Sequence, residues 1–288
     1  MTISETRFTL DTADRHTIAC FARTGPGPVR GVVQLVHGMA EHIRRYRHVA
    51  EALAAAGYAV YGSDHRGHGD LARERAHAVR HQRDGQAGVA LAQVVRDDRE
   101  VVHQRLEATG AEVPERTAFA AQLYMLDHSH LVAGIALSGT SALELLDVRH
   151  SGWTVESANA SVGTPRTPAD WLSRDPAVAD AFLADPLCAF SLTEASLFSI
   201  FDDGARTTDR AQLDRIRKDL PLFLFTGDRD PVNGLLAWFH PLVDRLRGAG
   251  LTDVSTHVYG GARHEVFNET NRREVIANLV AWIDRVNA

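Results

Sequence analysis

The sequence is poor in cysteine. Only Cys20 and Cys188 occur among 288 residues, far apart and in no spacing typical of a metal site. Disulfides stabilise small secreted domains, whereas proteins of reducing compartments keep their thiols free. We therefore expect two free, buried thiols rather than a disulfide.

Long apolar runs are also missing. No stretch approaches the roughly 20 consecutive apolar residues that a membrane-spanning helix needs. The first ten residues, MTISETRFTL, have neither the basic region nor the apolar core of a signal peptide. We find no internal repeat and no low-complexity segment. These absences predict a cytoplasmic protein with no transmembrane segment.

Positive charge is not in excess. The formal net charge is −6, which gives no reason to expect nucleic acid as a partner. Hydrophobic residues make up 44% and charged residues 24% of the chain, as in ordinary globular proteins. A chain of 288 residues is long enough for one large α/β domain or two smaller ones. The sequence does not indicate an oligomeric state.

The most informative stretch is residues 32–71, VVQLVHGMAEHIRRYRHVAEALAAAGYAVYGSDHRGHGDL. Residues 32–36 and 58–61 are short apolar runs, typical of strands that are buried on both faces. Between them, residues 45–56 have helical periodicity, and Gly57 stands where a helix would end. Strand, helix and strand in this order form a βαβ unit, which predicts a parallel sheet.

Similar patterns predict the other elements. We expect a β-hairpin over residues 6–21 and strands over residues 131–137, 222–225 and 254–258. We also expect helices over residues 89–107, 118–126 and 274–286, and one that follows residue 232 and ends at residue 247. Prolines interrupt short helical pieces between residues 142 and 210, where apolar side chains are frequent. We therefore predict a core of residues 1–141 and 211–288, with a helical cap of residues 142–210.

Two loops of residues 32–71 carry a family resemblance. The pattern HG-x-x-EH-x-x-RY, followed by D-x-RGHG, resembles the α/β-hydrolases of the monoacylglycerol lipase and lysophospholipase type. The resemblance continues through RTPADWLSRDP, DPLCAF, GDRDPV, GARHEVFNE and DRVNA, so that it covers most of the chain from Val32 onward. It implies the α/β-hydrolase fold, a mostly parallel sheet with helices on both faces and an inserted helical cap.

The same resemblance implies an activity. Relatives hydrolyse carboxylic esters, so we expect a small-molecule acyl ester or lipid as substrate and no cofactor. In the family, the residue after His-Gly supplies one backbone N–H of the oxyanion hole, and here that residue is Met39. The apolar cap would suit an acyl chain, although such residues more often bury themselves against the core.

Asp230 and His264 are the candidate acid and base. Each follows a predicted strand late in the chain, in the order acid then base that α/β-hydrolases use. A carboxylate beside an imidazole fixes its tautomer and stabilises the imidazolium that forms during proton transfer. GDRDPV resembles the acid loop of the family, and GARHEVFNE resembles its histidine loop. This resemblance assigns the roles of acid and base to Asp230 and His264. Asp228 is the rival acid, but it matches the family position less well.

The nucleophile is missing from the sequence. This fold needs a Gly-x-Ser-x-Gly elbow between a strand and a helix, and no such motif occurs. The family would place it within residues 107–117, EATGAEVPERT, which contain no apolar run and include Pro114. None of the other serines considered fits the strained strand-to-helix turn of an elbow; these are Ser63, Ser129, Ser138 and Ser141.

Three hypotheses follow from this absence. The natural protein could carry a strand and elbow that this sequence lacks. The chain could be a catalytically inactive binding protein, or an enzyme that uses Asp230 and His264 for proton transfer without a serine. Loss of a central strand would force the strands near residues 32 and 131 to pair directly. Otherwise it would leave buried amides unpaired, at a cost of ~1–3 kcal/mol each.

Histidine is abundant, with 15 residues, but we predict no metal. Asp64-His65-x-x-His68-x-Asp70 differs from the H-x-H-x-D-H spacing of binuclear metallohydrolases. In the resembled family this loop is structural. His77 and His81 lie one helical turn apart in an arginine-rich segment, where surface positions are the better interpretation.

Overall fold

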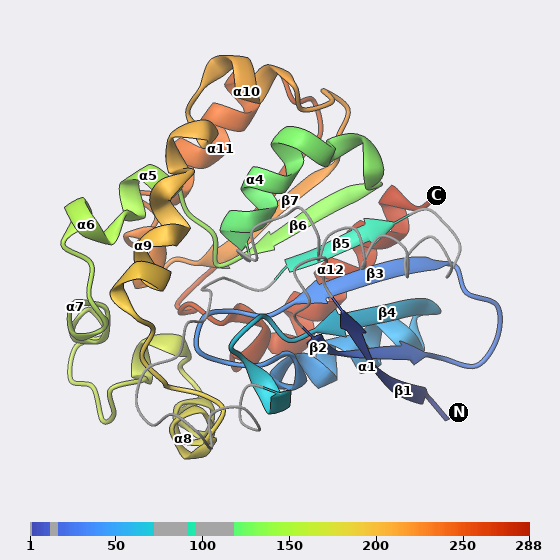
Figure 1. The fold of residues 1–288 in the computed structure, drawn as a ribbon, viewed down its shortest axis with the longest axis horizontal. Coiled ribbons are helices and arrows are strands. Elements are labelled where there is room, and N and C mark those ends of the chain that lie inside the picture. Colours follow the sequence, from blue (N-terminus) through green and yellow to red (C-terminus); the bar gives the residue numbers. More distant parts are fainter. Residues whose placement is uncertain (1, 12–16, 72–90, 96–117) are drawn as a thin grey trace.

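A computed structural model describes residues 2–11, 17–71, 91–95 and 118–288 (Figure 1). Eight strands form one sheet in the order β1-β2-β4-β3-β5-β6-β7-β8. Their bounds are β1 Ser4–Asp11, β2 Thr17–Thr24, β3 Gly31–Val36, β4 Tyr58–Ser63, β5 Leu91–Val95, β6 Gly134–Ser138, β7 Leu222–Gly227 and β8 Val254–Tyr259.

The sheet is mostly parallel, as predicted. Six strands run in one direction, and only β2 and β5 run in the other. The hairpin β1–β2 forms one edge of the sheet. The predicted strands all exist, with ends that differ by a few residues. Four of them, β3, β4, β6 and β7, are short apolar runs in the interior of the sheet, as expected of parallel strands that helices cover on both faces.

The predicted helix over residues 89–107 is wrong where the structure describes it. Leu91–Val95 is strand β5, which pairs antiparallel with β3 on one side and with β6 on the other. The rest of that predicted helix lies outside the described residues. β5 fills the central position for which the sequence offered no strand, so β3 and β6 neither pair directly nor leave their facing edges open. The demand for pairing between two buried strands overrides the local periodicity.

Helices cover both faces of the sheet. α1 (Arg47–Ala55) and α12 (Arg272–Val286) bury their apolar sides in one core cluster, and α12 crosses behind β3 and β5 in Figure 1. α4 (Ala118–His128) and α11 (Phe239–Gly248) belong to the cluster on the other face. The chain turns from α1 into β4 at Gly57, whose φ of 95° favours glycine.

Short helices lie between β6 and β7, where the cap was predicted. Several begin at a side chain that accepts a hydrogen bond from the first turn, as Thr154, Asp175 and Thr193 do. Pro176 follows Asp175 at the first helical position, which suits proline. The helices are α5 Leu143–Leu146, α6 Val148–Ser151, α7 Val155–Ala160, α8 Pro176–Ala184, α9 Glu194–Asp202 and α10 Arg210–Asp214.

None of the helices in the described parts of the chain is long and apolar enough to cross a membrane. The loops that follow β3, β4, β6, β7 and β8 all leave the sheet at its carboxyl edge, because these strands are parallel. Ligands of open α/β sheets bind at this edge.

Backbone strain is concentrated in the loop between β7 and α11. Gly234, Leu235 and Leu236 all have positive φ, at 63°, 53° and 79°. A left-handed conformation costs a residue with a side chain ~1–2 kcal/mol. Leu235 is 46% exposed, so its side chain recovers little of that cost through packing.

We predict that Leu235→Gly raises the free energy of unfolding by ~0.5–1 kcal/mol, because relief of strain exceeds the entropy that glycine gains in the unfolded chain. Urea unfolding measures this change. The same substitution at Leu183, which is 39% exposed within α8, should instead lower the free energy by ~1 kcal/mol. A loss of stability in both variants would contradict the assignment of strain to Leu235.

Candidate functional site

Asp230 and His264 meet at the carboxyl edge of the sheet. His264 Nδ1 lies 3.1 Å from each of the two carboxylate oxygens of Asp230. Asp230 is fully buried, and the His264 side chain is 12% exposed. No described residue forms a hydrogen bond with His264 Nε2. Asp230 therefore holds the proton on Nδ1 and leaves Nε2 as the nitrogen that can accept one.

The charge of Asp230 governs the ionisation of His264. Burial by itself would lower the pKa of the imidazole. The charge of Asp230 and its hydrogen bond outweigh that effect, with smaller contributions from Glu265 and Glu41, and the pKa of His264 lies above its ordinary value. A base whose protonated form is stabilised in this way is suited to take a proton from a reacting group.

The turn after β7 fixes the Asp230 carboxylate. One oxygen accepts a hydrogen bond from Val232 N at 2.8 Å, and the other lies 3.1 Å from Thr226 Oγ1. The rival acid, Asp228, points elsewhere and accepts a hydrogen bond from Gly261 N at 2.7 Å. The structure therefore brings Asp230 to the imidazole and uses Asp228 to brace the loop after β8.

Gly139 allows the imidazole to approach the end of β6. It has φ of 59°, and a Cβ atom at this position would lie 3.1 Å from His264 Nδ1 and Cε1. Trp171, from the segment before α8, packs against the His264 ring, with ring centroids 5.3 Å apart. Both the core and the predicted cap thus position His264.

Met39 follows β3 in the loop that begins at His37. It is half-buried, and its N–H forms no hydrogen bond within the described residues. The next residue, Ala40, has φ of 53°, and its N–H donates to His68 Nε2 at 3.2 Å. Within the described residues, the turn thus gives the Met39 N–H no protein acceptor. The oxyanion role of Met39 remains a prediction.

Three histidines pack beneath this loop. His37 Nε2 accepts the N–H of His65, and His65 Nε2 donates to the carbonyl oxygen of His37. The rings of His37, His65 and His68 lie within 5.9 Å of one another, centroid to centroid. Burial, and to a smaller degree the charge that His68 would carry, lowers the pKa of His65 to about 3. These hydrogen bonds give the histidines a structural role, as the resemblance implies.

A buried charge cluster joins the loop after β3 to the loop after β8. Arg45 forms two hydrogen bonds with Glu265, at 2.6 and 2.7 Å, and a third with Glu41. Glu41 also accepts hydrogen bonds from Gly38 N and from Tyr46 Oη, the latter at 2.8 Å. Since Gly38 precedes Met39 and Glu265 follows His264, this cluster fixes the two loops relative to each other.

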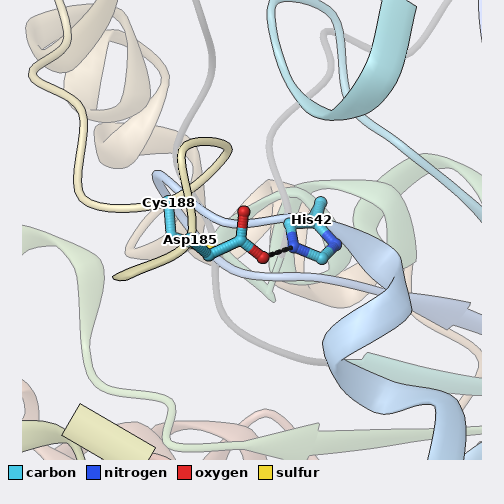
Figure 2. Close-up of side chains that lie close together, drawn as sticks. All are labelled: His42, Asp185 and Cys188. Carbon is cyan, nitrogen blue, oxygen red and sulfur yellow. Dashed lines mark hydrogen bonds and ion pairs between the residues drawn. The ribbon is translucent and has the colours of Figure 1, made fainter. Parts of the chain in front are cut away.

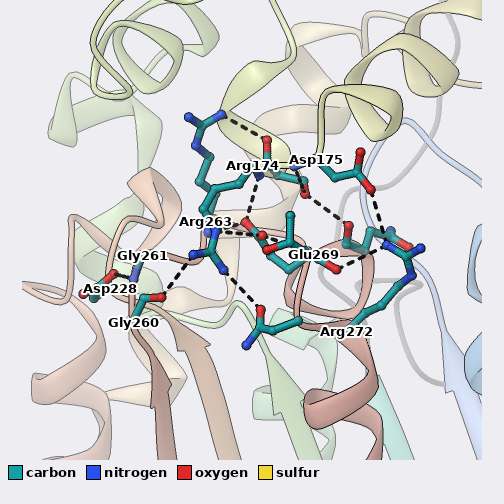
Figure 3. A network of polar contacts seen from close by, with 12 residues as sticks. Arg174, Asp175, Asp228, Gly260, Gly261, Arg263, Glu269 and Arg272 are labelled. Carbon is teal, nitrogen blue, oxygen red and sulfur yellow. Dashed lines mark hydrogen bonds and ion pairs between the residues drawn. The ribbon is translucent and has the colours of Figure 1, made fainter.

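Glu269 ties the segment before α8 to the same loop (Figure 3). Its fully buried carboxylate accepts hydrogen bonds from Arg174 N, Arg174 Nε and Arg263 N at 2.9–3.0 Å. Arg272 bonds to Asp175 on the other side of the network, at 3.3 Å. The segment that carries Trp171 is therefore held against the loop of His264 by charge-assisted hydrogen bonds.

None of the candidate serines forms a hydrogen bond with His264 within the described residues. Ser129 Oγ accepts the N–H of Arg217 at 3.1 Å, which accounts for its burial. Ser63 ends β4, Ser138 ends β6, and Ser141 is buried with no hydrogen-bond partner for its Oγ within the described residues. The interval 107–117, where the family places the elbow, lies outside the described residues.

The direction of β5 also bears on the nucleophile. Leu91, the first residue of β5, pairs with Val36 and Leu137 near the carboxyl ends of β3 and β6. An antiparallel strand thus brings its amino end to the edge where His264 lies. It cannot present there the strand-to-helix turn that a nucleophile elbow requires.

Sequence reasoning missed the residues that support the site, namely Glu41, Arg45, Glu265 and Glu269. Glu41 and Arg45 are four residues apart within the HG-x-x-EH-x-x-RY pattern, a spacing that could have indicated an ion pair. Within the described residues, one group can share a metal ion, and it consists of His42, Asp185 and Cys188. The sequence did not single out these three together.

We predict that Arg45→Met lowers the free energy of unfolding by ~3–5 kcal/mol, because Glu41 and Glu265 would stay buried without their counter-charge. Urea unfolding is the measurement. Arg47→Met is the matched control and should change the free energy of unfolding far less, since Arg47 pairs with Glu51 on the exposed surface of α1. Similar losses in both variants would contradict the role of the buried cluster.

The buried His65 predicts a pH dependence of stability. The pKa of His65 is about 3 in the folded protein, whereas the unfolded chain binds a proton near the ordinary histidine pKa of 6.5. The contribution of His65 to the free energy of unfolding is therefore fully present above pH 6.5. It is lost as the pH falls from 6.5 toward 3, at up to ~1.4 kcal/mol per pH unit.

His65→Gln keeps a donor for the His37 carbonyl and removes this titration. We expect its free energy of unfolding to fall less steeply between pH 6 and pH 4 than that of the unmodified protein. His130→Gln, at an exposed position, should leave the slope unchanged. Equal slopes in all three proteins would exclude His65 as the source.

Comparison with known proteins identifies the family. The family model described as serine aminopeptidase, S33, matches residues 27–114 and 116–271. The monoacylglycerol lipase of Mycolicibacterium smegmatis (strain ATCC 700084 / mc(2)155) is 33% identical over 276 residues, which cover 88% of each protein.

Solved structures show the same fold. A highly thermostable carboxyl esterase from Bacillus coagulans, in complex with glycerol, superposes with a TM-score of 0.72 at 22% identity, covering 100% of both chains. The monoacylglycerol lipase of Paleococcus ferrophilus gives 0.61 at 20% identity, covering 99% of this chain and 100% of the other. With the family match and the relative above, these findings show that the chain belongs to the monoacylglycerol lipase-like family of α/β-hydrolases, a family of hydrolytic enzymes.

Proposed function

We propose that this hydrolase cleaves the ester bond of a single acyl chain, as in a monoacylglycerol or a lysophospholipid. The observation that carries the proposal is the buried contact of Asp230 with His264 Nδ1, which leaves Nε2 for proton transfer. The name of the relative from Mycolicibacterium smegmatis supports a monoacylglycerol as substrate. The apolar side chains of the predicted cap suit an acyl chain.

Each residue has one role in this proposal. His264 Nε2 takes the proton of the attacking hydroxyl group, and Asp230 stabilises the imidazolium that results. The Met39 N–H donates a hydrogen bond to the carbonyl oxygen as it gains negative charge. His264 then returns the proton to the leaving alkoxide, so the ester yields a fatty acid and an alcohol.

The attacking hydroxyl group separates two versions of the mechanism. If the natural chain carries a serine elbow that this sequence lacks, His264 activates that serine and an acyl-enzyme forms. In the chain as printed, the hydroxyl group would belong to water, which His264 would activate directly. The antiparallel β5, which brings its amino end to the site, favours the second version for this sequence.

We predict that His264→Ala and Asp230→Asn each lower kcat/KM for a monoacylglycerol by ~10²–10⁴-fold, the usual contribution of a positioned base. The measurement is release of free fatty acid. Asp228→Asn is the matched control, because Asp228 accepts a hydrogen bond from Gly261 in the next loop. This variant should change kcat/KM by less than about threefold, far below the loss expected when the base is removed. Equal losses in all three variants would contradict the assignment, and no hydrolysis by the unmodified chain would favour a binding protein.

Intact mass before and after a fluorophosphonate probe distinguishes the two mechanisms. A mass equal to the 31.5 kDa of the printed chain, with hydrolysis and no adduct, would support activation of water. A larger mass with one adduct that disappears in His264→Ala would support a serine elbow. An adduct on a chain of 31.5 kDa would point to one of the serines considered above.

A further inference from the structure

Three potential metal ligands meet where the predicted cap touches the loop after β3 (Figure 2). His42 lies in that loop, and Asp185 and Cys188 follow α8. One donor atom from each of the three side chains lies within 4.8 Å of the other two, and His42 Nε2 is 2.8 Å from Asp185 Oδ2. Neither Asp230 nor His264 belongs to this group.

We propose that His42, Asp185 and Cys188 form a zinc site that links the cap to the loop of Met39. Imidazole, carboxylate and thiolate are the three donor types that zinc uses in proteins. Zinc bonds of about 2.0–2.3 Å in a tetrahedron place ligand atoms about 3.3–3.8 Å apart. The observed cluster reaches this spacing with small movements, and water completes the fourth position.

The turn 185–188 presents two of the ligands together. Asp185 and Cys188 are separated by two residues, the spacing at which paired ligands often hold zinc. Cys188 N donates to the carbonyl oxygen of Asp185 at 3.0 Å, and Leu187 N donates to Asp185 Oδ1 at 2.8 Å. The second carboxylate oxygen, Oδ2, is the one directed at His42.

Burial and access both suit an ion. His42 and Cys188 are buried, whereas the Asp185 side chain is 33% exposed and leaves a route for an ion and its water. His42 Nδ1 has no partner within the described residues, so Asp185 provides the only hydrogen bond to this ring. The ring can therefore turn Nε2 from the carboxylate to a metal ion.

The protons balance simply. Zinc binding displaces the thiol proton of Cys188 to solvent and forms a zinc–sulfur bond. The neutral His42 binds through Nε2 and carries its proton on Nδ1, and Asp185 binds as the carboxylate. No oxidant or reductant takes part, so the site is reversible with chelators.

The position of the ion gives it a mechanical role. Ala189, next to Cys188, donates its N–H to the carbonyl oxygen of Ala40 at 3.0 Å. Both residues have positive φ, at 55° and 53°, so this contact is held under strain. Zinc at the neighbouring cluster would fasten the two strained segments together and hold the turn that precedes Glu41.

The test is metal binding by the full chain after treatment with a chelator. We expect one Zn²⁺ per chain by native mass spectrometry, and a thiolate-to-cobalt charge-transfer absorption when Co²⁺ replaces zinc. Cys188→Ala should remove that absorption and weaken Zn²⁺ binding by more than about 100-fold, beyond the usual effect of losing an outer-shell partner.

Cys20→Ala is the matched control, because Cys20 is the other buried free thiol and lies in β2. It should keep both the stoichiometry and the cobalt absorption. Asp185→Asn provides a second variant whose amide oxygen can still accept the Leu187 N–H, and it should also weaken binding. Added Zn²⁺ should raise the Tm of the unmodified chain and of Cys20→Ala, but not that of Cys188→Ala, as measured by thermal unfolding.

Two results would overturn the proposal. The first is the absence of Zn²⁺ binding at micromolar concentration by the unmodified chain. The second is full binding by Cys188→Ala, which would assign the ion to residues outside the proposed group.

Discussion

The facing edges of β3 and β6 carry backbone groups that have to be paired, because each buried group left unpaired costs ~1–3 kcal/mol. β5 pairs with both edges and so joins the two halves of the sheet. Strands lie about 4.7–4.9 Å apart, which places β3 and β6 about 10 Å from each other. The separation between the loop of Met39 and the loop after β6 is therefore set by one intervening strand. That spacing does not depend on the direction in which the strand runs.

Above the sheet, the Glu41–Arg45–Glu265 cluster makes a second connection between the two halves. Two carboxylates share one guanidinium in a buried place, where the removal of Arg45 would leave both carboxylates without a counter-charge. The pKa of Glu41 is raised, since burial outweighs the attraction of Arg45. Such a cluster adds little net stability over apolar packing, but it tolerates only one relative position of the loops. The cluster thus fixes the loop that contains Met39 relative to the loop that contains His264.

Particular residues show how far the sequence could predict this structure. The buried strands and the order of Asp230 before His264 were predictable, since each depends on a local run of residues. β5 was not, because the apolar positions of residues 89–107 fit a helical period and only the gap between β3 and β6 favours a strand. The Arg45–Glu265 pair joins positions 220 residues apart, so no local pattern could indicate it. The metal cluster joins His42 to Asp185 across 143 residues in the same way.

The surroundings of Asp230 favour proton transfer over a purely structural role. A turn after β7 could be capped by an uncharged side chain, without burying a carboxylate. Here the carboxylate is fully buried and pairs with His264, Gly139 is required for the approach of the ring, and Leu235 and Leu236 hold strained backbone nearby. Strain and buried charge that fold stability does not need are typical of functional sites. These costs gather around one imidazole nitrogen that no described residue bonds, and they support the proposal that His264 Nε2 takes up a proton.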